Sequence, residues 1–309
     1  MIATLTLNCA IDRTYYVRGF AAGAVHRVAR VFDEPGGKGN NVAKVARQLG
    51  CEVTASGFIA GRNGAYIEEN MKARGIRTAF VPVSGESRVC LNIVDEADGT
   101  STELLEPGPV ITEADRARLK ATVRELAAKS RVVTMSGSLP PGAPPELYAD
   151  LIGIVHEEKA LAFLDTSGSV LADALTARPD AVKPNDAELA AWAGRASLTE
   201  DECVKEALLL SQTIPIVCVT LGSRGAIAVI AGSAYHIKPP SIRAVNPVGC
   251  GDAFMAGLAA AATRDVSAEE CLRLATAAAA ANAMSVKAGD ADPMRVREFL
   301  EQVEVAPLS

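Results

Sequence analysis

The chain has 309 residues, of which 49% are hydrophobic and 22% charged, and its mean hydropathy is +0.17. This profile excludes a disordered protein and fits one large α/β domain or two ordinary ones. The net charge of −6 and the pI near 5.3 argue against a nucleic-acid-binding surface, although a local group of Arg and Lys side chains can still hold a small anion.

The start of the chain predicts a strand and no export signal. Residues 1–8 alternate apolar and polar side chains and lack the basic region and cleavage site of a signal peptide. The apolar stretch 274–286 is too short for a membrane span and contains Asn282, so we expect a buried helix and no membrane partner. The odd number of cysteines, 7, with no C-x-x-C pair fits a reducing cytoplasm, and the 3 histidines lack the spacing of a zinc hydrolase.

Strand and helix patterns alternate along the chain. The expected strands are 2–7, 53–57, 132–136, 161–165, 181–183 and 216–220, and the expected helices are 40–49, 64–74 and 112–129, with another opened by Pro144 and Pro145. Thr112 and Asp115 form a capping-box variant at the start of one helix. Short apolar strands joined by helices predict a doubly wound, mostly parallel sheet flanked by helices, which binds ligands at the carboxyl ends of its strands.

Two stretches interrupt this alternation. Residues 11–33 contain strand-like segments around Gly19 and Gly23, and residues 78–106 read as strands with a hairpin signal at Asp98-Gly99. We expect them to form a small β-sheet lid inserted in a single domain that spans 1–309. The alternative is a pair of irregular surface loops.

The most informative segment is Val248-Gly249-Cys250-Gly251-Asp252, which an apolar run follows at 253–262. Two glycines spaced by one residue allow backbone N–H groups to turn toward a common point, and the N-terminus of the next helix adds positive potential there. The pattern predicts an anion hole with a carboxylate beside it. Alone, Asp252 would more often be a helix cap.

Three more segments place glycine and charged residues at the ends of strands. Residues 34–41 (EPGGKGNN) precede a helix, but Phe32 and Gly39 stand where a Walker A loop requires Gly and Ser or Thr. Residues 183–188 end a strand and start a helix, and residues 220–225 end another strand at a hairpin. Each is compatible with a nucleotide or phosphate site and equally with an ordinary turn or cap.

In order, these segments resemble the phosphofructokinase B family of ribokinase-like sugar kinases over essentially the whole chain. The matching motifs are Asn8-x-Ala10-x-Asp12, Gly36-Gly37-Lys38-Gly39-x-Asn41-Val42-Ala43, Ser136-Gly137-Ser138-Leu139-Pro140-Pro141-Gly142, Lys183-Pro184-Asn185-x-x-Glu188, Thr220-x-Gly222-x-x-Gly225 and Val248-Gly249-x-Gly251-Asp252. Each motif is weak alone, but six in the family's order are not expected by accident.

The resemblance implies a role for each matching residue. Asp252 corresponds to the base that takes the proton of the acceptor hydroxyl, and the N–H groups of Gly249, Cys250 and Gly251 correspond to the anion hole. The substrate positions are Asp12, Gly37, Lys38, Asn41, Arg88 and Ser138; the ATP contacts are Lys183, Asn185, Thr220, Gly222 and Gly225, with Asn282 near the base. Glu188 corresponds to the residue that binds Mg²⁺ through water.

Smaller features bear on the substrate. Thr102-Glu103, the run 106–109 and Lys38 resemble the branch acting on fructose 1-phosphate or tagatose 6-phosphate, and Lys38 with Arg88 suits a phosphorylated sugar. We therefore expect a cytoplasmic ATP- and Mg²⁺-dependent kinase for D-fructose 1-phosphate, with tagatose 6-phosphate or fructose 6-phosphate as alternatives. A sugar-phosphate-binding regulatory protein without turnover is the alternative of another class.

The sequence also departs from the family pattern. Pro247 stands where Thr is frequent, Cys250 replaces Ala or Ser, and Asn40 replaces an aliphatic residue. Pro247 puts monovalent-cation activation and donor geometry in doubt but leaves Asp252 unaffected. Because β-rich insertions leave open sheet edges, we expect a symmetric homodimer joined through the lids.

Overall fold

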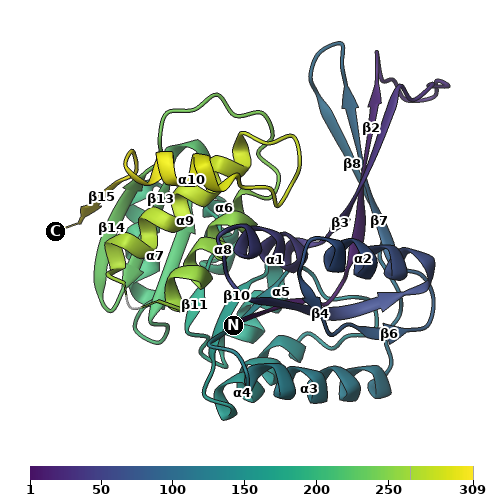
Figure 1. Ribbon diagram of the computed structural model, residues 1–309. Coiled ribbons are helices and arrows are strands. Elements are labelled where there is room, and N and C mark those ends of the chain that lie inside the picture. Colours follow the sequence, from purple (N-terminus) through teal and green to yellow (C-terminus); the bar gives the residue numbers. More distant parts are fainter. Residues whose placement is uncertain (265, 309) are drawn as a thin grey trace.

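The body of the molecule is a large, mostly parallel β-sheet (Figure 1). The computed structural model describes residues 1–264 and 266–308. In spatial order the strands are β15 (Glu304–Pro307), β14 (Ser233–Lys238), β13 (Ala226–Ile230), β12 (Ile216–Thr220), β11 (Ala181–Val182), β10 (Leu161–Asp165), β9 (Val132–Ser136), β1 (Ile2–Thr6), β4 (Val53–Ala60) and β5 (Arg77–Thr78), with β6 (Val81–Val83) also on β4. The pairs β12–β13, β13–β14 and β14–β15 are antiparallel, and the other neighbours pair in parallel.

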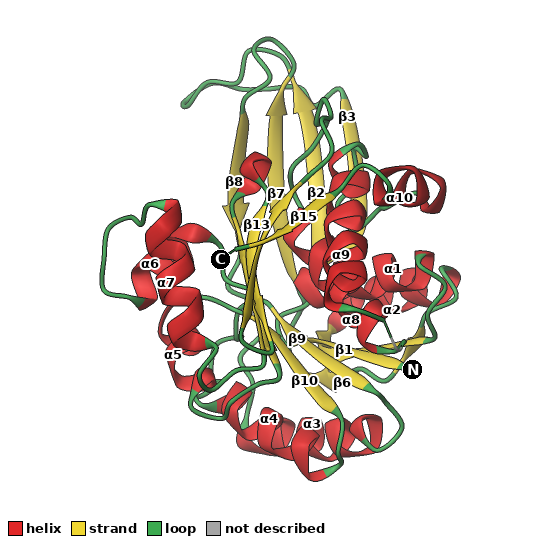
Figure 2. Cartoon of the chain, turned by 90° about the vertical axis from the view of Figure 1, so that its left-hand side faces the viewer, coloured by secondary structure: helices red, strands yellow, loops and turns green. Residues whose placement is uncertain are grey.

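Helices cover both faces of this sheet (Figure 2). One layer contains α1 (Lys38–Gln48), α2 (Gly61–Ala73), α8 (Cys250–Ala262), α9 (Ala268–Ala283) and α10 (Pro293–Leu300); the other contains α3 (Glu113–Ala127), α4 (Leu147–Glu157), α5 (Gly168–Leu175), α6 (Asp186–Trp192) and α7 (Glu200–Leu210). Each layer packs its apolar stripe on one face, so strands such as β1 and β9 are buried along their whole length. The predicted doubly wound α/β class is therefore confirmed.

A second, smaller sheet projects from the body (Figure 1). Its order is β3 (Arg30–Gly36), β2 (Ala10–Val17), β7 (Arg88–Asp95) and β8 (Ser101–Leu105), and Asp98-Gly99 lies in the turn between β7 and β8. We call this sheet the lid. The expected second lid segment, 78–106, begins too early, because β5 and β6 are short parallel additions to β4 and leave only the part from Arg88 onward in the lid.

Local signals in the sequence account for several boundaries. Thr112 and Asp115 form the predicted reciprocal capping box at the start of α3. The strands predicted at 132–136, 161–165 and 216–220 coincide with β9, β10 and β12. Across the described residues, we find no helix with the length and hydropathy that a membrane crossing requires.

Candidate active site

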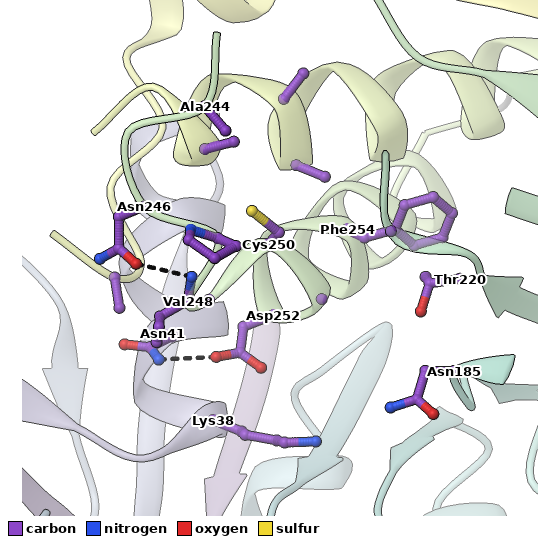
Figure 3. A pocket seen from close by; sticks show the side chains of 18 of the residues that line it. Lys38, Asn41, Asn185, Thr220, Ala244, Asn246, Val248, Cys250, Asp252 and Phe254 are labelled. Atoms are coloured by element: carbon purple, nitrogen blue, oxygen red, sulfur yellow. Dashed lines mark hydrogen bonds between the residues drawn. The ribbon is translucent and has the colours of Figure 1, made fainter. Parts of the chain in front are cut away.

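A deep cleft of about 1560 Å³ lies between the lid and the carboxyl ends of the parallel strands. The start of α8 and the start of α1 form one side of it, and Asn185 and Thr220 line the other (Figure 3). The predicted site residues that line this cleft are Asp12, Gly37, Lys38, Asn41, Arg88, Lys183, Asn185, Glu188, Thr220, Gly222, Gly225, Gly249, Cys250, Gly251 and Asp252. Segments from six parts of the sequence therefore meet in one place.

The turn that opens α8 has the geometry that its glycines predict. Gly249 has a φ of 81°, in the left-handed region, and a Cβ there would lie 3.0 Å from the backbone N of Gly289. At Gly251 a Cβ would lie 3.1 Å from Nζ of Lys183. Gly251 therefore lies against the ammonium of Lys183, which suits a phosphoryl group. The N–H of Cys250, one of the three predicted donors, instead donates to the carbonyl oxygen of Pro247 at 3.3 Å, because the turn closes on itself there.

Asp252 lies in the first turn of α8 and does not cap it. The helix has no side-chain cap hydrogen bond, and the Oδ2 atom of Asp252 instead accepts a 2.7 Å hydrogen bond from Nδ2 of Asn41 (Figure 3). Burial, followed by the nearby charge of Asp165, raises the pKa of Asp252 to about 6, against the opposing effect of Lys38, Asn41 and Lys183. Such a carboxylate is ionised at neutral pH and still basic enough to take a proton.

Asp165 is the principal site residue that the sequence analysis missed. It ends β10, is fully buried, and lies 3.3 Å from Nζ of Lys38 and 3.4 Å from Nζ of Lys183. Burial opposes its ionisation, but Lys183 and Lys38 together hold the pKa of Asp165 below its usual range. Asp165 and Asp252 therefore have opposite pKa shifts, which is typical of sites that assign different roles to two carboxyl groups. An acidic residue at the carboxyl end of a buried strand was the available signal.

Lys38 presents its charge to the cleft. Although burial opposes it, Asp165, then Asp252 and Glu188, raise the pKa of Lys38, so its ammonium is permanent. Its side chain keeps 41% of its surface exposed, whereas that of Lys183 keeps 4%. Lys38 is thus the cation more available to a second phosphate.

The lid side of the cleft contains Asp12 and Arg88. The Asp12 carboxylate lies directly over Gly36, where a Cβ would come within 2.1 Å of its Cγ atom and would displace the carboxylate. Arg88 donates long hydrogen bonds to the carbonyl oxygens of Asn8 (3.3 Å) and Glu106 (3.4 Å). Ser138 does not line the main cleft; it is exposed in an adjoining hollow of about 460 Å³ that Arg88 also lines.

On the opposite side, Asn185 and Glu188 form a reciprocal capping box at the start of α6. Oδ1 of Asn185 accepts from the N–H of Glu188 at 2.7 Å, and Oε2 of Glu188 accepts from the N–H of Asn185 at 2.9 Å. Gly225 has a φ of 98°, and a Cβ there would meet the carbonyl oxygen of Ile237 at 2.0 Å. The loop after β12 therefore requires glycine to approach β14.

The donor set suits Mg²⁺ held indirectly. Among residues 1–264 and 266–308, no group of three or more His, Cys, Asp or Glu side chains could enclose a metal ion. Glu188 lines the cleft, and its hydrogen bond with Asn185 leaves carboxylate lone pairs free. Because Mg²⁺ keeps several waters and binds phosphate oxygens, one such carboxylate is compatible with it.

Asn282 is placed differently from the other predicted nucleotide contacts. It is fully buried and does not line the cleft. Its Nδ2 atom donates to the carbonyl oxygen of Val248 at 2.9 Å, and its Oδ1 atom accepts from the N–H groups of Gly289 and Asp290 at 2.8 and 3.1 Å. These contacts favour a role for Asn282 in supporting the turn at Gly249 over contact with the nucleotide base.

Thr276, which lies N-terminal to Asn282 on α9, is a nucleotide-side candidate that the sequence analysis missed. It lines the cleft, and its buried Oγ1 atom has no hydrogen-bond partner within the described part of the chain. The Ala-rich sequence around it gave no signal.

The structure shows the surroundings of the departures from the family pattern. Asn40 is buried, and its Nδ2 atom donates to the carbonyl oxygen of Gly36 at 2.8 Å, which steadies the glycine turn. Oδ1 of Asn246 accepts from the N–H of Val248 at 3.0 Å across Pro247 (Figure 3). Burial raises the pKa of Cys250, so its side chain is a neutral thiol.

Comparison with known proteins agrees with this geometry. The family model for pfkB family carbohydrate kinases matches residues 5–295. Tagatose-6-phosphate kinase of Staphylococcus epidermidis is 36% identical over 309 residues, 99% of each chain, and 1-phosphofructokinase of Rhodobacter capsulatus is 41% identical over 279 residues, 89% of this chain and 88% of the relative. Phosphofructokinase-2 of Escherichia coli in complex with potassium has a TM-score of 0.92 at 27% identity, covering 97% of this chain and 98% of that one. The chain therefore belongs to the pfkB family of carbohydrate kinases.

Proposed function

We propose that the protein transfers the γ-phosphoryl group of ATP to a phosphorylated ketohexose, with D-fructose 1-phosphate as the leading substrate and fructose 1,6-bisphosphate as the product. As a pfkB family carbohydrate kinase, it is a phosphotransferase with an alcohol group as acceptor. Asp252 carries the proposal, since a buried carboxylate with a pKa of about 6 stands beside an anion hole. The relative named 1-phosphofructokinase supports this choice of sugar.

The chain's own groups account for the chemical step. Asp252 accepts the proton of the attacking hydroxyl as the new O–P bond forms and the bond to the ADP oxygen breaks. Asn41 fixes the orientation of that carboxylate through its 2.7 Å hydrogen bond. In this proposal the N–H groups of Gly249 and Gly251 stabilise the charge of the transferred phosphoryl group, whereas that of Cys250 donates to the carbonyl oxygen of Pro247.

Two cations are available to the phosphate that the sugar already carries. Lys38 exposes its ammonium in the cleft, and the guanidinium of Arg88 lies between the cleft and the hollow that contains Ser138. Asp12 and Gly37 lie beside them and suit the sugar hydroxyls. A sugar without a phosphate would leave Lys38 with Asp165 and Arg88 with two long hydrogen bonds to carbonyl oxygens as their contacts.

The nucleotide occupies the other half of the cleft in this proposal. Lys183, Asn185, Thr220, Gly222 and Gly225 line it there, and Lys183 lies next to Gly251. Glu188 would hold Mg²⁺ through water, and the ion would neutralise charge on the phosphate oxygens.

Tagatose 6-phosphate is the second candidate substrate. The relative from Staphylococcus epidermidis carries that name and is similar along 99% of this chain. The same residues would serve it with the sugar reversed, so that its 6-phosphate meets Lys38 and Arg88 and its C1 hydroxyl meets Asp252.

We also propose one kinase domain per chain and a homodimer joined through the lids. The lid exposes the apolar side chains of Val31, Phe32, Leu104 and Leu105, and β3 and β8 are open sheet edges. A second copy of the same lid would cover both. The 7 free thiols support a reducing, cytoplasmic location.

A coupled assay of ADP release over a panel of acceptors tests the substrate. The panel contains fructose 1-phosphate, fructose 6-phosphate, tagatose 6-phosphate, fructose and ribose. Fructose 1-phosphate should have the highest kcat/KM, and the unphosphorylated sugars should be poor. A higher kcat/KM for an unphosphorylated sugar would overturn the phosphosugar assignment and leave the kinase assignment standing.

A further inference from the structure

Lys44 is a buried cation to which neither the sequence analysis nor the proposed mechanism gives a role. It lies on α1, is only 5% exposed, and does not line the cleft. Burial of an ammonium is costly unless hydrogen bonds and opposite charges compensate for it. The contacts that compensate for it here show what Lys44 holds in place.

Two backbone carbonyl oxygens from distant segments share its Nζ atom. Lys44 donates to the oxygen of Pro35 at 3.1 Å and to the oxygen of Ala288 at 2.9 Å. Pro35 directly precedes Gly36 and Gly37, at the junction of lid strand β3 with α1. One ammonium therefore joins the base of the lid to the segment that follows α9.

That second segment supports the anion hole from behind. We call residues 286–290 the backing segment. A Cβ at Gly249 would lie 3.0 Å from the backbone N of Gly289 and 3.1 Å from Cβ of Ala288, so the two turns are in direct contact. Gly289 also packs on Lys44, where a Cβ would meet Cε at 2.6 Å. A shift of the ammonium would therefore reach the anion hole through two contacts.

The position of Lys44 on α1 explains how one helix serves both halves of the site. Lys38, Asn41, Lys44 and Gln48 follow at helical spacing and share one side of the helix. In that order they contact Asp165, Asp252, Ala288 and Asp290. Lys44 is thus the middle of a polar stripe that runs from the cleft to the end of the backing segment.

Lys44 also interacts electrostatically with Asp12. Burial raises the pKa of Asp12, and the positive charge of Lys44, followed by that of Arg88, opposes the rise. Burial lowers the pKa of Lys44, and Asp12 and Glu34 oppose that in turn. The carboxylate and the ammonium therefore each favour the charged form of the other, against the effect of burial.

We propose that Lys44 is a positioning residue of the phosphoryl transfer: it fixes the glycine turn at Gly36 relative to the backing segment and places a positive charge beside Asp12. This inference rests on the proposed function, since it assigns the sugar side of the cleft to Asp12. If Lys44 only filled the core, its substitution would lower protein stability and would change the kinetics with the sugar and with ATP to the same extent.

Three variants at this position separate charge from packing. Lys44→Met keeps the length of the side chain and removes both charge and donors, Lys44→Gln keeps an amide donor for the carbonyl oxygens, and Lys44→Arg keeps both. Arg47→Met is the matched control, because it removes a cation from an exposed position on the same helix. Each protein is measured for thermal unfolding and for kcat and KM with the best sugar and with ATP.

We expect kcat/KM for the sugar to fall about 10- to 100-fold in Lys44→Met and in Lys44→Gln, with KM for ATP within about twofold of the unmodified protein. Lys44→Arg should recover most of the loss, and Arg47→Met should match the unmodified protein. If Lys44→Met does not fold, Lys44→Gln provides the test, because it retains a hydrogen-bond donor for the buried carbonyl oxygens.

Two results would overturn the inference. One is a folded Lys44→Gln with sugar kinetics like those of Arg47→Met. The other is an equal loss of kcat/KM for the sugar and for ATP, in proportion to the fall in Tm, that Lys44→Arg does not reverse. If the proposed function is wrong, the unmodified protein will release no ADP with any acceptor, and that result is distinct from the two above. If another sugar proves to be the best substrate, the variants can still be compared with that sugar.

Discussion

The hydrogen bond from Asn41 to Asp252 makes a quantitative prediction about the pH dependence of catalysis. With a pKa of about 6, Asp252 is about 90% ionised at pH 7. Asn41→Leu keeps a side chain of similar size and removes the 2.7 Å donor that favours the charged carboxylate. A hydrogen bond to a charged group contributes about 1.5–3 kcal/mol, or about 1–2 pKa units, so the pKa should rise to about 7–8.

The sign of the effect follows from the role of the carboxylate. Asp252 acts as a base only when ionised, so activity is present above its pKa and is lost as the pH falls through it. The acid limb of the kcat/KM profile should move up by about 1–2 pH units in Asn41→Leu, and about 10–50% of the carboxylate would remain ionised at pH 7. Much of the loss at pH 7 should therefore return by pH 9.

The assay is a pH profile of coupled ADP release from pH 5 to 9.5 with a stable linking system. Substrate phosphates also titrate near pH 6 but are common to all variants, so the difference between profiles is the measured quantity. Asn40→Leu is the control, because its amide contacts Gly36 and Cys9 and not Asp252. The reasoning would be refuted if the acid limb of the kcat/KM profile had its midpoint at the same pH in Asn41→Leu as in Asn40→Leu.

Further variants test the other parts of the site. Asp252→Asn should keep the fold and lower kcat by about 10²–10⁴, measured by single-turnover ADP formation; near-normal kcat would remove Asp252 from the base role. Arg88→Ala and Lys38→Ala should each lower kcat/KM for the phosphosugar about 10- to 100-fold, with ATP binding by calorimetry little changed, and equal losses for both substrates would argue against a phosphate site there. Sedimentation at micromolar concentration should show a dimer that Leu104→Asp dissociates, because the change places a charge on an exposed lid position that does not line the cleft; an active monomer would exclude the lid dimer.

The sequence predicted the parts of this protein that depend on local rules. Strands buried on both faces, the capping box of Thr112 and the glycine turn at Gly249 follow from periodicity and backbone preference, and the structure contains all of them. The extent of the second lid segment was predicted less well, because whether a short strand such as β6 joins the lid or β4 depends on tertiary pairing.

Within the site, the sequence predicted residues in recognisable motifs and missed those defined by their surroundings. Asp165 and Thr276 lie in ordinary strand and helix patterns, and only the fold brings them to the cleft. Asn282 was expected near a base because of the family resemblance, but its amide is engaged by the backbone of Val248, Gly289 and Asp290. Contacts between segments far apart in sequence leave no local pattern.

The central claim is phosphoryl transfer to a phosphosugar with Asp252 as the base, and identification of the product tests it most directly. The unmodified protein and Asp252→Asn are incubated with Mg·ATP and fructose 1-phosphate, and the products are followed by phosphorus NMR. We predict one fructose 1,6-bisphosphate formed for each ADP with the unmodified protein and almost none with Asp252→Asn. ADP without a new sugar phosphoester, or equal product from both proteins, would contradict the account.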